Sequence, residues 1–192
     1  MLKQSVLATA LAFGTATYSS AATILFDFEE NLSDNSTTQS YSVAGLNLTV
    51  GSVGGNINRG GRGLGVSGTP EGGRLGDGET LTFSFDQPIF SVTARIFESG
   101  PEDEDFRFSG FGSTTDYIAE GGGPAYTTIT INSGTGVNSI LFQGLEPNAG
   151  GNRGVRIGSL EVRLTPIPLP ASGVLLGIAA LGLVGRNKRQ GS

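Results

Sequence analysis

Glu79-Thr-Leu-Thr-Phe-Ser-Phe85 alternates polar and apolar side chains, and residues 89–97 continue the same alternation. A period of two residues is typical of a β-strand that has one face in a hydrophobic core. The side chains expected on the inward face are Leu81, Phe83, Phe85, Val92, Ala94 and Ile96. Two adjoining strands of this kind, with no helical period beside them, indicate an all-β protein.

The same alternation recurs in short segments that are separated by glycine-rich turns. These segments are residues 23–28, 41–43, 46–50, 64–66, 106–108, 114–119, 126–131, 137–142 and 155–164. Roughly nine to eleven short strands in about 140 residues predict an antiparallel, jelly-roll-like β-sandwich. We expect the last strand to pair near the first and to change phase at Gly158-Ser159. Residues 51–78, which are rich in glycine, are predicted to form a long surface loop.

The first 22 residues have the pattern of a secretory signal peptide. Lys3 gives a positive start, residues 6–16 are mostly apolar, and Ser20-Ala21-Ala22 places small side chains before the expected cleavage point. A first transmembrane helix is the alternative, but the apolar run is short. The sequence therefore predicts three parts: a signal peptide (1–22), a β-sandwich domain (23–165) and a C-terminal segment (166–192).

The C-terminal segment combines a proline-rich stop, an apolar helix and a basic tip. Residues 171–185 carry no charge and would span about 22 Å as a helix, against about 30 Å for a bilayer core. The basic residues after them would hold the cytoplasmic end by the positive-inside rule. These are Arg186, Lys188 and Arg189. An ordinary tail anchor or a buried apolar helix are the alternatives.

This ending resembles the PEP-CTERM family of bacterial sorting tails, in the variant whose signature is Val-Pro-Leu-Pro-Ala. The matching residues are Ile167, Pro168, Leu169, Pro170 and Ala171, with isoleucine in place of valine at the first position. The resemblance implies recognition by an exosortase, a membrane transpeptidase, after transient anchoring in the inner membrane. It also implies export to the bacterial surface or to an extracellular, biofilm-type matrix.

Composition removes several kinds of chemistry. The chain has no cysteine and no histidine, so it has no Ser-His-Asp triad, no cysteine nucleophile and no histidine-ligated zinc. Residues 23–165 contain eight arginines against 17 acidic residues, a net charge of −9. Nucleic acid is therefore not an expected partner, because its phosphates would be repelled. Among metals, an oxygen-liganded ion such as Ca²⁺ remains plausible.

Acidic side chains in three segments are candidate calcium ligands, since Ca²⁺ takes six to eight oxygens in flexible geometry. The candidates are Asp27, Glu29, Asp77, Glu102, Asp103 and Asp105. Each segment also has a simpler interpretation: the run at 102–105 as a solvated hairpin tip, and Asp77 as a turn former. A structural calcium ion is thus one reading of these residues, and solvated turns are the other.

Tyr117 and Tyr126 flank a glycine-rich turn and are the candidates for stacking against a sugar ring, although packing within a sheet is the competing role. Residues 63–68 match a dinucleotide-binding glycine string, but no helix follows them, so a turn is expected instead. We expect a non-enzymatic protein, and the resemblance to sorting-tail proteins implies a structural or adhesive role within extracellular polysaccharide or biofilm matrix. A carbohydrate-binding module with a structural calcium ion is the alternative, and a hydrolase using carboxylates alone is a weaker one.

Overall fold

The computed structural model describes residues 22–29, 36–67, 73–98, 104–119, 126–145 and 154–165. These residues form ten strands, and within them no helix has the length and apolar character of a membrane span. The predicted signal peptide, apart from Ala22, and the predicted sorting tail lie outside the described residues. The strands are β1 (Thr23–Asp27), β2 (Thr38–Val43), β3 (Leu46–Val53), β4 (Asn56–Gly60), β5 (Gly63–Ser67), β6 (Thr80–Glu98), β7 (Glu104–Gly110), β8 (Ser113–Ala119), β9 (Tyr126–Gly144) and β10 (Val155–Arg163).

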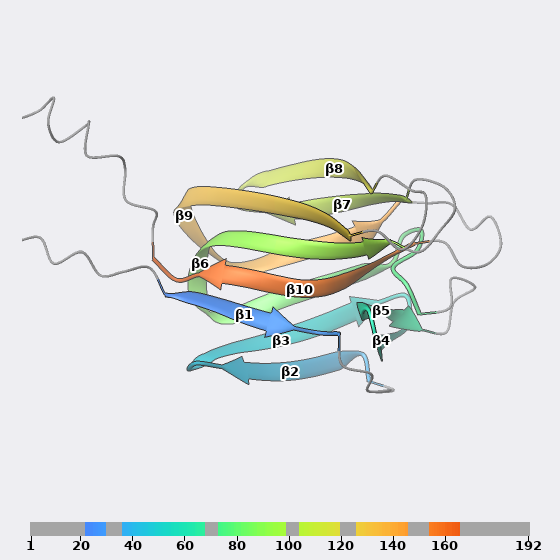
Figure 1. The fold of residues 1–192 in the computed structure, drawn as a ribbon, viewed down its shortest axis with the longest axis horizontal. Helices are drawn as coiled ribbons and strands as arrows, with labels where there is room; N and C mark the ends of the chain where they lie inside the picture. The colour runs from blue at the N-terminus through green and yellow to red at the C-terminus, as the bar shows by residue number, and fades with distance from the viewer. Residues whose placement is uncertain are drawn as a thin grey trace, which may run out of the picture.

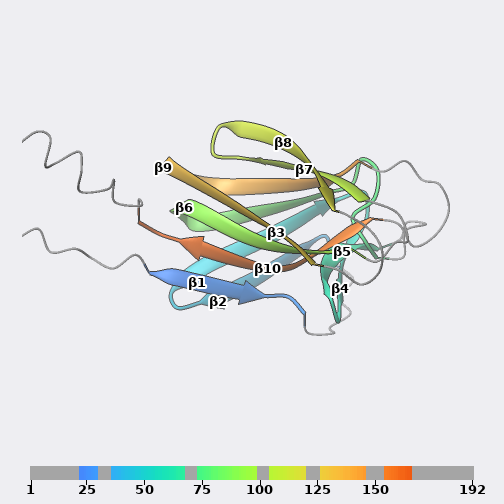
Figure 2. The same cartoon turned by 45° about the horizontal axis from the view of Figure 1, so that its top comes forward.

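All strand pairs are antiparallel, and two long strands, β6 and β9, connect the halves of the sandwich. The first part of β6 pairs with β3, and its last part pairs with β10. Strand β9 follows β6 along both parts and also pairs with β7. In Figures 1 and 2, β7 and β8 therefore lie on one side of the sandwich, and β2 and β3 lie on the other.

The length of β6 and β9 is a correction to the sequence-based expectation, which divided each into two separate strands. Residues 86–88 are exposed, and the register between β6 and β9 shifts between Ser84 and Ile89 and again before Ser91. Such irregularities bend a strand without ending it. The inward positions accordingly change from odd to even numbers, as the alternation around Phe85 and Val92 predicts.

Aromatic side chains fill the space between the two halves. Phe26 of β1 lies 6.3 Å from Phe85 of β6, although these strands are not paired with each other. Phe83 meets Phe28 at 5.9 Å and Phe142 at 5.7 Å between ring centroids. All six inward side chains predicted for residues 79–97 are buried. The expected all-β antiparallel sandwich is confirmed for the described residues.

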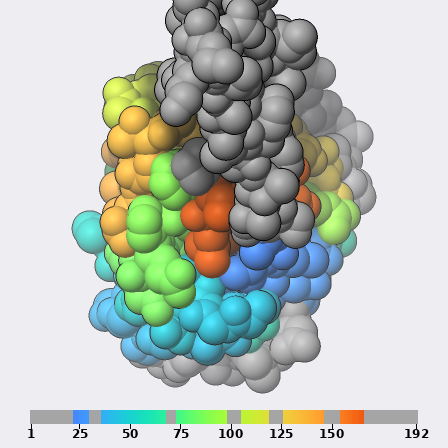
Figure 3. Space-filling model, turned by 90° about the vertical axis from the view of Figure 1, so that its left-hand side faces the viewer, coloured from blue at the N-terminus to red at the C-terminus, as the bar shows by residue number. Residues whose placement is uncertain are grey.

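The two ends of the domain meet at one point. Strand β1 pairs with β10 from Thr23 opposite Arg163 to Asp27 opposite Ser159. Figure 3 shows blue β1 beside orange β10 on this end of the molecule. The phase change predicted near Gly158 is also confirmed, because the register of β10 against β6 shifts between Ile157 and Ser159.

The prediction of a long surface loop at residues 51–78 is wrong. Most of this region is ordered β-structure: the end of β3, the β4–β5 hairpin and a bridge between Val66 and Arg74. Glycine is frequent here because backbones approach closely. A Cβ on Gly65 would lie 2.3 Å from the carbonyl oxygen of Gly73. A glycine-rich composition is common to flexible loops and to segments whose backbones pack closely. The composition alone therefore could not tell the two apart.

Candidate functional site

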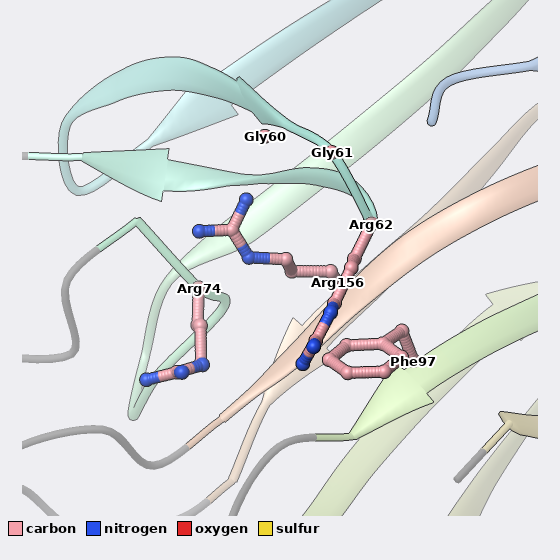
Figure 4. A pocket seen from close by; sticks show the side chains of 6 residues that line it. All are labelled: Gly60, Gly61, Arg62, Arg74, Phe97 and Arg156. Carbon is pink, nitrogen blue, oxygen red and sulfur yellow. The ribbon is translucent and has the colours of Figure 1, made fainter. Parts of the chain in front are cut away.

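A pocket of about 260 Å³ lies where the β4–β5 turn approaches the start of β10. Its lining residues are Gly60, Gly61, Arg62, Arg74, Phe97 and Arg156. Figure 4 shows that the three arginines come from separate segments: the hairpin turn, the segment before Leu75, and β10. The pocket therefore depends on the folded arrangement of distant parts of the chain.

Glycine at the hairpin turn allows the turn to come close to β10. Gly63 has φ of +123°, and a Cβ there would lie 2.3 Å from the carbonyl oxygen of Ile157. A Cβ on Gly60 would lie 2.0 Å from a terminal nitrogen of Arg156. Pairing of Leu64 with Ile157 then joins the hairpin to the sheet. The absence of a Cβ at Gly60 and Gly63 thus allows the turn to contact Arg156 and the backbone of β10.

Arg156 is partly buried, whereas Arg62 is exposed. The Nη1 of Arg156 donates to the side-chain oxygen of Asn58 and to the carbonyl oxygen of Gly63, each at 3.4 Å. Burial lowers the pKa of Arg156, and the neighbouring charges of Arg74 and Arg62 lower it further. Arginine nevertheless keeps its charge at any physiological pH. The surroundings of Arg156 therefore disfavour the positive charge that its guanidinium group carries.

Arg62 lies over an aromatic ring. Its guanidinium carbon is 4.5 Å from the ring centroid of Phe97, and no salt-bridge partner for Arg62 occurs in the part of the chain that the structure describes. Phe97 is only 2 % exposed although it does not belong to the main core cluster. This phenylalanine faces outward from β6, and Arg62 of the hairpin turn lies over its ring (Figure 4).

The aromatic–cation stack continues along the sheet beyond the pocket. Phe97 meets Tyr126 edge to face at 5.1 Å, and the guanidinium carbon of Arg95 lies 3.5 Å from the centre of the Tyr126 ring. Arg95 also forms a salt bridge of 3.0 Å with Glu29. The order Arg62, Phe97, Tyr126, Arg95 therefore places two neighbouring rings between two cations, and each cation lies over one ring.

The predicted sugar-stacking tyrosines have neighbours on their rings. Tyr126 is 37 % exposed, but Arg95 occupies one face of its ring. Tyr117 stacks on Phe106 at 5.4 Å and an interplanar angle of 15°, and it packs against the core. These contacts fit the packing role that competed with sugar binding in the sequence, and the two tyrosines lie on different parts of the sheet.

The structure describes four of the six predicted calcium ligands; Glu102 and Asp103 lie outside the described residues. Asp27 accepts a hydrogen bond from the backbone of Glu29 at 2.9 Å, and Glu29 is paired with Arg95. Asp77 forms an isolated β-bridge with Gly144 through its backbone. The carbonyl oxygen of Asp105 accepts a hydrogen bond of 3.1 Å from the backbone N–H of Leu145. These four acids thus fall in two places. No group of three metal-ligating side chains occurs among the described residues.

A further carboxylate in this region, Glu79, supports the fold. It is 5 % exposed and accepts a hydrogen bond of 2.7 Å from the backbone of Gly76. Its own backbone donates to the carbonyl oxygen of Gly76 at 3.1 Å. Both contacts close the turn that leads into β6, and such a turn is the expected role of the neighbouring Gly-Asp-Gly sequence.

The arginine pocket was not predicted from the sequence, because its members are far apart along the chain and match no local motif. One indirect signal was present: every basic residue between 23 and 165 is arginine. Three of these eight arginines line one pocket in a domain with a net charge of −9. Guanidinium groups gathered in this way are suited to binding an oxyanion.

No family model matches the chain, and no curated protein matches its sequence. Among solved structures, CsCBM6-3 from Clostridium stercorarium, determined in complex with cellobiose, is similar at 14 % identity and a TM-score of 0.33. The match covers 73 % of this chain and 93 % of that one. The PRD1 vertex protein P5 is similar at 10 % identity and a TM-score of 0.28, covering 77 % of this chain and 73 % of that one. A likeness of this size carries no information on ligand or activity.

Proposed function

We propose that this chain is an exported, non-enzymatic binding protein of the bacterial surface or extracellular matrix, and that its β-sandwich binds extracellular polysaccharide. The observation that carries this proposal is the arginine pocket, which lies at the opposite end of the domain from the start of β1 and the end of β10. A domain tethered by one end and recessed at the other is arranged to present a ligand site outward.

The geometry of β10 supports this orientation. Arg156, in the pocket, is near the start of the strand, and Arg163, opposite Thr23, is at its end. Seven residues at about 3.4 Å each separate the two by roughly 24 Å. In Figure 1 the β4–β5 hairpin lies at one end of the sandwich, and the start of β1 and the end of β10 lie at the other. A tail leaving β10 would hold the pocket away from its anchor.

Export and sorting form the second part of the proposal, and they rest on the two ends of the sequence. A cleavable signal peptide would send the chain across the inner membrane. The segment 166–192, with its proline-rich motif and basic tip, would hold it there until an exosortase acts. Mass spectrometry of the protein in surface fractions tests this step. A mass that includes an intact C-terminus at Ser192 would contradict processing.

A binding role is favoured over catalysis by the chemistry of the pocket. Its lining supplies three permanently charged guanidinium groups and one covered ring, and arginine does not exchange protons near neutral pH. The chain also contains no histidine or cysteine to act as base or nucleophile. Such a pocket can hold and orient an anionic group, which is the task of an adhesive or matrix-binding domain.

Co-sedimentation of the exported protein with the extracellular polysaccharide of the producing bacterium tests the proposed function. We expect the protein to pellet with the polysaccharide at low ionic strength and to be released as salt rises, because screening weakens charge-based contacts. Bovine serum albumin, which is also acidic, is the control for trapping. Protein that stays in the supernatant at every salt concentration, as the control does, would refute polysaccharide binding.

A further inference from the structure

We propose that Arg62, Arg74 and Arg156 form a binding site for a single carboxylate carried by an acidic sugar unit. The inference rests on the proposed polysaccharide-binding function and adds to it the chemical group that is recognised. A uronic acid residue in an otherwise neutral glycan is the class of ligand that this site would take.

Convergence of like charges is the first argument. The three guanidinium groups reach one pocket of about 260 Å³ from three segments of the chain. Like charges repel, and repulsion grows in a partly enclosed site where water screens less. The lowered pKa of Arg156, which Arg74 and Arg62 help to cause, is a sign of this repulsion. An anion in this pocket would be attracted to all three guanidinium groups at once.

Preorganisation is the second argument. Arg156 is held by Asn58 and by the carbonyl oxygen of Gly63, while Arg62 packs over the ring of Phe97. Long cationic side chains normally lose conformational entropy when they order around a ligand. Here the fold has already restricted two of them. A planar guanidinium in a fixed orientation can give a carboxylate two parallel hydrogen bonds.

Size and surroundings decide between ligand classes. A pocket of 260 Å³ is below the range of roughly 300–1,000 Å³ that is usual for drug-sized ligands, so it fits one small charged unit. The rest of the domain is strongly acidic, and it would repel a densely charged polymer such as nucleic acid. An isolated carboxylate on a neutral chain meets the three arginines without placing further negative charge on the acidic surface.

The pocket also lacks an open aromatic surface for a neutral sugar. Phe97 is 2 % exposed beneath Arg62, so its ring is not available for stacking. Recognition at this site would therefore depend on charge. We expect a strong preference for an acidic sugar over the neutral sugar of the same ring shape.

The test uses the full chain, labelled with ¹⁵N, produced in an exporting bacterium and purified. D-glucuronate, D-glucose and inorganic phosphate are titrated separately, and the arginine Nε–Hε signals are followed by NMR. We expect glucuronate to shift the signals of Arg62, Arg74 and Arg156, and glucose to leave them unchanged. Equal shifts with glucose, or tighter binding of phosphate than of glucuronate, would overturn the carboxylate assignment.

Charge-neutralising variants locate the site. Arg62→Gln and Arg156→Gln should each weaken glucuronate binding about tenfold or more, as expected for loss of a charged hydrogen-bond donor. Arg163→Gln is the matched control, because it removes the same charge at the other end of β10. Arg62 lies in an exposed turn, so its variant remains informative even if Arg156→Gln does not fold. Unchanged affinity in Arg62→Gln would refute the site.

The same variants separate the two proposals. If Arg62→Gln still sediments with extracellular polysaccharide as strongly as the native protein does, the polysaccharide is bound elsewhere. The carboxylate site would then be wrong and the proposed function would stand. If the native protein does not sediment with polysaccharide at all, the proposed function fails independently of the titrations.

Discussion

Replacing Gly63 with alanine should detach the β4–β5 hairpin from β10 and open the arginine pocket. The new Cβ would lie 2.3 Å from the oxygen and 2.6 Å from the carbon of the Ile157 carbonyl, and 2.7 Å from the nitrogen of Gly158. All three are backbone atoms of a central strand, so they cannot move aside by rotating a side chain. The φ of +123° at Gly63 adds strain for any residue that has a Cβ.

The expected loss of stability combines two terms. A non-glycine residue in a sparsely populated backbone conformation costs about 1–3 kcal/mol. Forcing an additional carbon into a packed contact costs about 1–3 kcal/mol more. Together they predict a loss of about 2–6 kcal/mol, out of the roughly 5–15 kcal/mol that stabilise a typical domain. At about 2–4 °C per kcal/mol, the Tm should fall by roughly 4–24 °C.

Gly61→Ala is the matched control, because it lies in the same turn and a Cβ there would have no atom within 4 Å. We expect its stability to remain within about 0.5 kcal/mol of the native value. Urea unfolding followed by circular dichroism measures both variants, and hydrogen exchange in β5 (Gly63–Ser67) reports whether the hairpin has lifted. If Gly63→Ala is as stable as Gly61→Ala, the hairpin does not pack against β10 as described.

Other changes separate binding, packing and charge. Gly60→Ala should lower glucuronate affinity about tenfold, because its Cβ would lie 2.0 Å from Nη1 of Arg156. Stability should change by less than about 1 kcal/mol, since that guanidinium is the movable end of a side chain; a stability loss without an affinity loss would contradict this. Phe142→Ala should cost about 3–5 kcal/mol in urea unfolding, because its buried ring contacts three other phenylalanines; a cost below about 1 kcal/mol would show that the core is not packed this way. The hydrogen bond from Arg107 lowers the pKa of Asp116 from 3.8, so the pair's contribution should be present above the unfolded-state pKa and disappear as pH falls through the folded-state value. The free energies of unfolding of the native protein and of Asp116→Asn, measured over a pH series, test this. A difference between the two that grows as the pH falls would contradict the stabilising role of the pair.

The alternation in residues 79–97 was sufficient to predict the class of fold and the inward side chains of β6. It could not show that β6 continues through residues 86–88, because a bulge and a turn have the same polar composition. The sequence also predicted the phase change near Gly158, where the apolar positions move from odd to even. Alternation is a local property, and it reports on burial along one strand at a time.

Prediction failed where close packing between distant segments decides the structure. Residues 60–65 have the glycine-rich composition of a flexible loop, yet backbone contacts require two of these glycines, Gly63 against β10 and Gly65 against residue 73. Phe97 occupies an outward position, and only the folded hairpin explains why it is buried. The arginine pocket depends on both contacts, so no single segment of sequence contains its signal.

The position of β10 has a mechanical consequence. If the protein is anchored after Arg163 and holds its ligand through Arg156, a pull between ligand and anchor passes along this one strand. Backbone hydrogen bonds join β10 to β6 from Val155 to Arg163 and to β1 from Ser159 to Arg163, and they run perpendicular to the strand. Such a force would load these bonds in shear and all at once, instead of opening them one after another. Tension would thus meet a strand that is paired along both of its edges, and single-molecule pulling between these two points would measure its resistance.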